Sequence, residues 1–552
     1  MNSSNLLLAA FMLTSPIAFY ADEPLLQESH APVIRALILV PKPTEKSELP
    51  PAEGVLVHDL KLPGKGQKLE KLLADLAVGK SLTPELLVEI KRTIITYYRE
   101  NSRPVVTVMI PEQEISDGVV EVVVIEGKLG KVVCKGNRWF KNKLIESYLD
   151  IEPGDAITND SLLTDVTWMN KNPFRRTDIL FTPGEAFGTT DIELVTKDRF
   201  PARFYTGGDN TGNDATGNER WFAGFNWGNA FFCDHQLNYQ YTTSSDFHDF
   251  QSHTISYNAP LPWRHILLLF GGYGSVHPDL SSKDTHFGDF KSHGHSSQAS
   301  ARYQMPWGKL YRSSLKEWVV GFDFKNTNNN LEFVSDDTIP IITKTVNISQ
   351  LVGGFNWGKE TGHHKFSFST ELFWSPGKIF PNQSNSDFDN LRPDAKNRYV
   401  YGKFTLGDVY HFPANLALSV LLRGQLANKN LLPSEQYGLG GFNTVRGYNE
   451  REVNVDNAFI FNFEFWSFPF HLFRKVGDEL IVLGFVDYAI GSDHKAAPGQ
   501  KKSEFLLGAG PGLRYTINPY LSFRLDWGFK LHRTEFEDPK ISKVNFGFIL
   551  SY

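Results

Sequence analysis

From about residue 199 onward, this 552-residue chain alternates apolar and polar side chains and shows no helical period. In NAFIFNFEF, residues 457–465, phenylalanines recur at every second position, and Asn462 and Glu464 lie between them. The same alternation appears in HQLNYQY (235–241), HKFSFSTELFW (364–374) and LSFRLDWG (521–528). Because neighbouring side chains of a strand point to opposite faces, each segment predicts a β-strand with one apolar and one polar face.

Such strands fit a soluble sandwich with inward apolar faces, or an outer-membrane barrel whose apolar faces meet lipid. The 43 Phe, 20 Tyr and 11 Trp residues and an export-like N-terminus favour the barrel. Roughly 350 residues of strands would also make a very large sandwich but an ordinary barrel of about 16 strands. The chain stops within KVNFGFILSY (543–552), and a barrel must pair its last strand with its first. We therefore expect residues 198–552 to form an all-β transmembrane barrel of about 16 antiparallel strands.

The N-terminus has the composition of a secretory signal. An apolar core from Leu6 to Leu13, too short to span a bilayer, precedes a cleavage position after Ala21. We expect residues 1–21 to be a signal peptide and residues 22–54 to be an extension ending in a Pro-rich linker. Within this extension, APVIRALILV (31–40) fits a short strand or part of a helix, and the sequence leaves both open.

Residues 55–197 show the order strand, helix, helix, strand, strand twice, in residues 55–127 and 128–197. The second helix of the first repeat is the clearest, because Thr83 suits its N-cap and Pro84 its first turn. Its apolar stripe consists of Leu86, Ile90, Ile94 and Tyr97. Each repeat is long enough for one small α+β core with helices packed on one sheet face.

Several classes of function lack support in the sequence. A net charge of −6 and a pI near 6.3 give no footprint for nucleic acid. Cys134 and Cys233 exclude a disulfide framework and a metal site of the usual spacing. We find no phosphate-binding loop, dinucleotide fingerprint or G-x-S-x-G elbow, and His363 and His364 lack the zincin spacing. We therefore expect no enzyme activity, no cofactor, no metal and no nucleotide.

One segment, GLGGFNTVRGYNE (438–450), places Arg446 near a glycine pair among aromatic-rich strands. Taken alone it reads as a surface turn, because turns use Gly, Asn and charged residues. It is also one of four segments that, in chain order, resemble the outer-membrane transporters of two-partner secretion, the TpsB or hemolysin secretion/activation family. The other three are PEQEISDGVVEVVVIEGKLGKV (111–132), DNTGNDATGNERW (209–221) and GFVDYAIG (484–491). The family lies within the wider group that includes BamA-like assembly barrels.

The resemblance implies a fold of two periplasmic POTRA modules, residues 55–127 and 128–197, followed by the barrel. The loop motif that enters the barrel lumen consists of Val445, Arg446, Gly447 and Tyr448. Arg446 is expected to pair with Asp487 on the lumen wall, in a strand motif that also contains Phe485. Gly440, Gly441 and Gly447 are expected to let the loop turn tightly and approach the wall. An N-terminal plug helix, common in this family, is left open, because residues 22–40 show no clean amphipathic stripe.

The resemblance implies that the chain transports an unfolded secreted partner protein, its client, across the outer membrane, which is a form of type V secretion. The POTRA modules are expected to recognise this client in the periplasm. A client can add a strand to an exposed sheet edge, although the sequence does not show which edge is open. Outer-membrane lipid and the barrel assembly machinery that inserts the chain are further expected partners. An assembly factor that inserts other barrels, and a passive porin or surface adhesin, are the alternatives.

Overall fold

The computed structural model describes residues 32–43, 53–115, 117–213, 216–277, 289–308, 310, 314–328, 330–334, 338–342, 345–473, 475–496, 501–534 and 540–552. The chain divides into two compact units, one of residues up to 137, 145–169 and 177–197, the other of residues 138–144, 170–176 and 198–552. The expected signal peptide, residues 1–21, lies outside the described residues. Among the described residues, no helix is long and apolar enough to cross a membrane.

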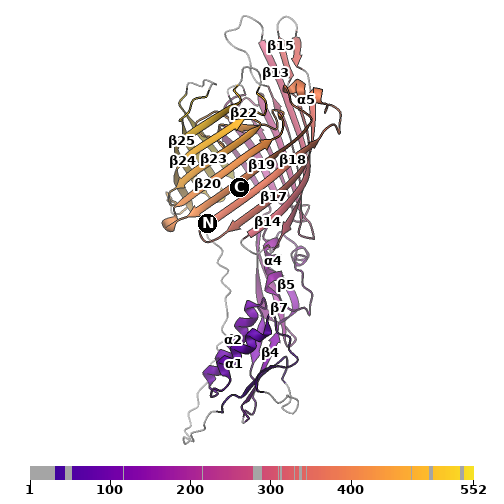
Figure 1. Cartoon of the computed structure of the whole chain (residues 1–552), viewed down its shortest axis with the longest axis vertical. Helices are drawn as coiled ribbons and strands as arrows, with labels where there is room; N and C mark the ends of the chain where they lie inside the picture. Colours follow the sequence, from indigo (N-terminus) through magenta and orange to yellow (C-terminus); the bar gives the residue numbers. More distant parts are fainter. Residues whose placement is uncertain are drawn as a thin grey trace. The chain divides into compact units, whose positions relative to one another are not determined.

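The first module is a four-stranded sheet with two helices (Figure 1). Its elements are β1 (Ala36–Val40), β2 (Gly54–Val57), α1 (Gly66–Ala77), α2 (Pro84–Glu100), β3 (Val106–Met109) and β4 (Val119–Glu126). The strand order is β2-β1-β4-β3, so β1 is a central strand, parallel to both neighbours. The segment that the sequence left undecided is therefore a strand. The expected module boundary at residue 55 is wrong, because the sheet begins with residues that had been assigned to the extension.

The core of the first module explains this position. All five residues of β1 are fully buried. Leu37 and Leu39 pack in the cluster that includes the two helices, while Ile38 belongs to a separate cluster on the other face. Helix α2 begins as expected, since the Thr83 hydroxyl accepts a hydrogen bond from the backbone N–H of Leu86 at 3.2 Å.

The second module repeats this arrangement with a three-stranded sheet. Its elements are β5 (Lys128–Lys135), α3 (Asn142–Glu146), α4 (Asn159–Met169), β6 (Arg175–Pro183) and β7 (Thr189–Asp198), and the strand order is β5-β7-β6. Cys134 lies in β5, and burial raises the pKa of its thiol to about 12, so the thiol stays protonated. Neither Cys134 nor Cys233 forms a disulfide in the structure.

The barrel is a closed antiparallel sheet of sixteen strands, seven from β8 to β14, four from β17 to β20 and five from β23 to β27 (Figure 1). The strands are β8 (Ala202–Asp209), β9 (Arg220–Ala230), β10 (His235–Thr243), β11 (Phe250–Pro260), β12 (Ile266–Val276), β13 (Asp289–Trp307), β14 (Ser314–Asn328), β17 (Thr345–Glu360), β18 (His364–Pro376), β19 (Arg398–His411), β20 (Ala417–Ala427), β23 (Asn457–Trp466), β24 (Asp478–Ser492), β25 (Ser503–Ile517), β26 (Leu521–Lys530) and β27 (Ser542–Ser551). The last strand closes on the first, with residues 547–551 paired to residues 205–209. The expected strand number and closure are thus confirmed.

The remaining elements belong to the connections between barrel strands. β15 (Asn330–Val334) pairs with β13 and with β16 (Thr338–Ile342), so this hairpin extends the wall. β21 (Tyr437–Leu439) and β22 (Val453–Val455) form a separate two-stranded sheet in the connection between β20 and β23. The short helices are α5 (Asn385–Leu391) and the 3₁₀ turn η2 (Pro413–Asn415).

The faces of the barrel strands have the polarity of a membrane barrel. Large apolar side chains such as Leu372, Trp374 and Trp527 are 54%, 49% and 48% exposed on the outer face. Polar side chains at alternate positions, among them Asp487 and Asp526, are fully buried on the inner side. An apolar exterior of this extent fits contact with lipid rather than with water.

The position of β1 yields a test with two fragments. A fragment of residues 32–197 should unfold cooperatively on heating, followed by far-ultraviolet circular dichroism. A fragment of residues 55–197 should show a smaller transition, because its first module lacks a central strand and only the sheet of the second module remains complete. In the longer fragment, Leu37→Ala should lower the free energy of unfolding by about 2 to 5 kcal/mol. Equal cooperative unfolding of both fragments would contradict the central role of β1.

Candidate functional site

The candidate site is the long loop between β20 and β23, residues 428–456. Its two limbs pair through β21 and β22, and residues 440–452 connect them. Side chains at the tip of this segment contact inward-facing residues of β23, β24 and β26. The loop therefore reaches into the barrel lumen, and we call residues 440–452 the lumen loop.

Arg446 is bound by Asp487 of β24 in a two-point contact. Its Nε lies 2.7 Å from Asp487 Oδ2, and its Nη2 lies 2.8 Å from Oδ1. The backbone N–H of Arg446 also donates to Oδ2 at 3.1 Å. Arg446 is 2% exposed and Asp487 is fully buried. A paired fork of this kind is both strong and directional, so it fixes the orientation of the side chain as well as its position.

Two further carboxylates complete the surroundings of this guanidinium. Arg446 Nη1 lies 2.6 Å from Glu464 Oε1 and 3.3 Å from Asp526 Oδ1. Asp526 also contacts Arg514 at 2.8 Å and Arg524 at 2.6 Å. Three arginines and three carboxylates therefore balance in charge, which is the condition for burying ions without a large desolvation cost.

Phe485, the other wall residue singled out in the sequence, covers one face of this cluster. The guanidinium carbon of Arg446 lies 3.5 Å from the centre of the Phe485 ring. The ring and the cation attract each other, and the ring also excludes water from the bonds to Asp487. Arg446, Phe485 and Asp487 are thus brought together in the structure.

The neighbours of Arg446 dock on the wall as well. Val445 is fully buried in an apolar cluster with Ile460 and Leu506. The Tyr448 hydroxyl accepts the backbone N–H of Leu507 at 3.2 Å and lies 2.5 Å from the carbonyl oxygen of His532. The motif VRGY therefore binds the wall through three side chains of different chemistry.

The loop glycines play two different roles. Gly440, Gly441 and Gly447 all have φ between +96° and +103°, a region that favours glycine. A Cβ on Gly447 would lie 3.0 Å from the carbonyl carbon of Gly528 in the wall. On Gly440 and Gly441 it would instead meet the returning limb of the loop, at Asn449 and Glu450. The expectation that all three approach the wall is wrong for Gly440 and Gly441, which serve the turn.

The wall supplies matching glycines that the sequence reading missed. A Cβ on Gly508 of β25 would lie 2.1 Å from the carbonyl oxygen of Arg446, and one on Gly528 of β26 would lie 2.4 Å from the amide nitrogen of Gly447. Lumen loop and wall thus meet backbone to backbone. Glu464, Arg524 and Asp526 were also missed as partners, although their strand alternation places them on polar faces.

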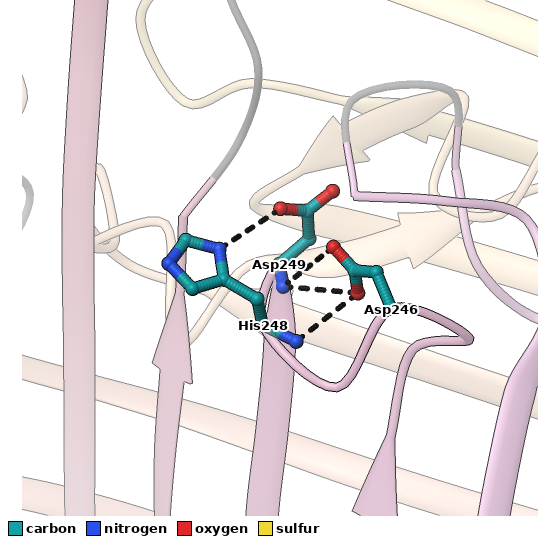
Figure 2. A group of neighbouring side chains, drawn as sticks. All are labelled: Asp246, His248 and Asp249. Atoms are coloured by element: carbon teal, nitrogen blue, oxygen red, sulfur yellow. Dashed lines mark hydrogen bonds and ion pairs between the residues drawn. The ribbon is translucent and has the colours of Figure 1, made fainter.

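A second cluster of titratable groups lies in the connection between β10 and β11 (Figure 2). Asp246 accepts the backbone N–H groups of His248 and Asp249, and the His248 ring lies 3.3 Å from the Asp249 carboxylate. A hydrogen bond from the Ser244 hydroxyl lowers the pKa of Asp246. These groups stabilise their own turn, so the cluster needs no metal to account for it.

Two small modules, each with two helices and one sheet, and a sixteen-stranded barrel with an arginine bound in its lumen define the class of POTRA-plus-barrel outer-membrane proteins. Within this class, residues 188–515 match the family described as "Haemolysin secretion/activation protein ShlB/FhaC/HecB". The match covers more than half of the chain, and the chain belongs to this family. It is a two-partner secretion transporter of the outer membrane, with its POTRA modules in the periplasm.

Curated relatives point in the same direction. The heme/hemopexin transporter protein HuxB of Haemophilus influenzae (strain 86-028NP) is 25% identical over 457 residues, which are 80% of this chain and 76% of that protein. The outer membrane transporter CdiB of Dickeya dadantii (strain 3937) is 21% identical over 422 residues, 73% and 71% of the two chains.

Two solved structures share the fold. CdiB from Escherichia coli matches with a TM-score of 0.72 and 15% identity, over 98% of this chain and 94% of that chain. BamA from Haemophilus ducreyi lacking POTRA domains 1–3 matches with a TM-score of 0.53 and 12% identity, over 88% and 97%. The family and the curated relatives favour secretion over the alternative of barrel assembly.

The wall glycines yield a test that leaves every charge in place. Gly508→Ala should displace the lumen loop, because the new Cβ would overlap the carbonyl oxygen of Arg446. We expect secretion of the partner protein to fall by about tenfold or more, the effect of losing one charge-assisted contact. Gly484→Ala is the control, since a Cβ there would meet no described atom within 4 Å. Equal secretion by the two variants would show that this close approach is unimportant.

Proposed function

We propose that the chain recognises its secreted partner in an unfolded state at the POTRA modules and passes it outward through the barrel. The transport needs no enzymatic step, nucleotide or cofactor from this chain. The observation that carries the proposal is a lumen loop held across a closed barrel by hydrogen bonds and ion pairs. Such bonds are strong when intact, yet they break without covalent chemistry, so the passage can open and close.

The sheet edges of the modules support recognition of an extended client. In the first sheet the edge strands β2 and β3 have only four residues each. In the second sheet, β5 already exchanges hydrogen bonds with the segment at residues 154–155. The other edge, β6, is nine residues long and exposes Leu180 and Phe181 at 51% and 37%. We infer that β6 is the edge at which the client adds a strand.

Two further partners belong to this proposal. The exposed apolar side chains of the barrel strands fit the hydrocarbon of the outer membrane. A closed barrel with an apolar exterior also requires assistance to insert into that membrane, and we propose that the cell's barrel assembly machinery inserts it. Neither partner contributes to recognition of the client.

The bound arginine yields the most direct functional test. Arg446→Ala leaves Asp487 and its neighbours with excess buried negative charge, which should cost the docked loop about 3 to 5 kcal/mol. Secretion of the partner into the medium should fall at least tenfold, while heat-modifiable mobility shows that the barrel still inserts. Arg533→Ala, at an exposed arginine of another connection, is the control. Normal secretion by Arg446→Ala would refute the role of the contact.

The edge strand yields a separate test. Replacing both Leu180 and Phe181 with Asp should weaken binding of the unfolded client to the purified chain by about tenfold, because the edge becomes charged. Binding is measured by fluorescence anisotropy of a labelled client fragment. Val88→Asp, at an apolar position on α2 that is 64% exposed, should leave binding unchanged. An equal loss in both variants would mean that β6 is not the specific edge.

A further inference from the structure

The base of the loop between β20 and β23 is a buried segment in its own right. Leu431 and Leu432 are 0% and 1% exposed and pack in an apolar cluster that includes Phe388 of α5 and Tyr401 of β19. The backbone N–H of Glu435 donates to the carbonyl oxygen of Leu432 at 2.8 Å, which closes a turn. The buried leucines and this turn fix the direction in which the Glu435 side chain points toward the wall.

Glu435 is 2% exposed, and its carboxylate receives three hydrogen bonds from three wall strands. Lys325 of β14 donates to Oε1 at 2.7 Å. Tyr401 of β19 and Gln350 of β17 donate to Oε2 at 2.6 Å and 2.8 Å. The side-chain amide of Gln425 in β20 also donates to the Glu435 carbonyl oxygen at 3.1 Å. A buried carboxylate with a lysine partner and two further donors is a satisfied, strongly held ion.

This contact is the electrostatic reverse of the one at Arg446. At the lumen loop a cation meets carboxylates of β23, β24 and β26, whereas at the base an anion meets donors from β14, β17 and β19. The two contacts therefore attach one loop to different parts of the wall. Between them lies a polar cavity of about 400 Å³, bordered by Gln436 and Tyr437 of the loop and by Thr370 and Lys403 of the wall. The loop is thus held by charged contacts at its base and at its tip, and between them Leu439 is buried against Ile460 and Leu506 of the wall.

We propose that Glu435 is a second positioning residue of the transporter, which fixes the base of the loop and keeps the resting pore closed. The contact at Arg446 holds the lumen loop, and Glu435 sets the point about which that part of the chain can move. Loss of Glu435 frees the base, so the loop leaves the lumen more often even when no client is present. The inference concerns the resting pore, and it stands or falls independently of how a client is recognised.

Single-channel recording of the purified full chain in planar phospholipid bilayers tests this inference. Glu435→Gln keeps the shape of the side chain but removes its charge, and Lys325→Met removes the partner. Each variant should raise the fraction of time that the pore spends open by about tenfold, because a hydrogen bond to a charged group is lost. The double variant should equal the singles, because one contact is lost in all three. Glu360→Gln, at an exposed carboxylate of β17, should behave like the parent chain.

Heat-modifiable mobility shows that each variant is folded before recording. Tyr401→Phe removes one donor and keeps the ring, so it should give a smaller increase in opening than Glu435→Gln. Unchanged opening of the folded Glu435→Gln variant would overturn the proposal. Independent, additive effects of Glu435→Gln and Lys325→Met would overturn it as well. A variant that unfolds at lower urea concentration but opens no more often than the parent chain would show a merely structural role, and would also overturn it.

Discussion

The structure depends on the burial of one guanidinium that cannot lose its charge. An arginine stays protonated in a protein, so Arg446 can be buried in the lumen only where carboxylates pair with its charge. Three strands supply these carboxylates, which belong to Asp487, Glu464 and Asp526. They lie 18 to 80 residues from Arg446 in the sequence. The wall from β23 to β26 must therefore be assembled before the site exists, and the loop in turn fills space that the wall would otherwise leave to water.

The other features of the site follow from this requirement. Because the guanidinium must reach the wall, the backbone that carries it must also approach closely. Gly508 faces Arg446 and Gly528 faces Gly447, where any Cβ would intrude. Tyr448 and Val445 then secure the flanks of the motif. Glu435 binds the base of the same loop to other strands with the opposite charge pattern. A loop held at its base and at its tip by breakable bonds suits a passage that must be tight at rest and open during transport.

Sequence reasoning reached the strands and their polarity, because alternation is a local signal. The Arg446–Asp487 pair was an expectation from the family resemblance of the two motifs that contain them. Sequence reasoning placed Glu464 and Asp526 on the polar face but could not place them beside Arg446. A period of two shows which face of the sheet a side chain is on, and it does not show at which level of the barrel the side chain meets the loop. Gly508 and Gly528 carry no signal beyond being glycines in strands. β1 was undecided because ALILV is buried on both faces and shows no alternation. Glu435 lies in a connection, whose contacts depend on the fold of strands far away in the sequence.

A double-mutant cycle between Arg446→Ala and Asp487→Ala measures the central interaction most directly. The free energy of unfolding of the purified barrel is obtained from urea titrations in detergent micelles for the parent chain, both single variants and the double variant. We expect the double variant to be little worse than either single variant, with a coupling energy of about 2 kcal/mol or more. Losses that add to within about 0.5 kcal/mol would contradict a direct, buried contact between the two residues.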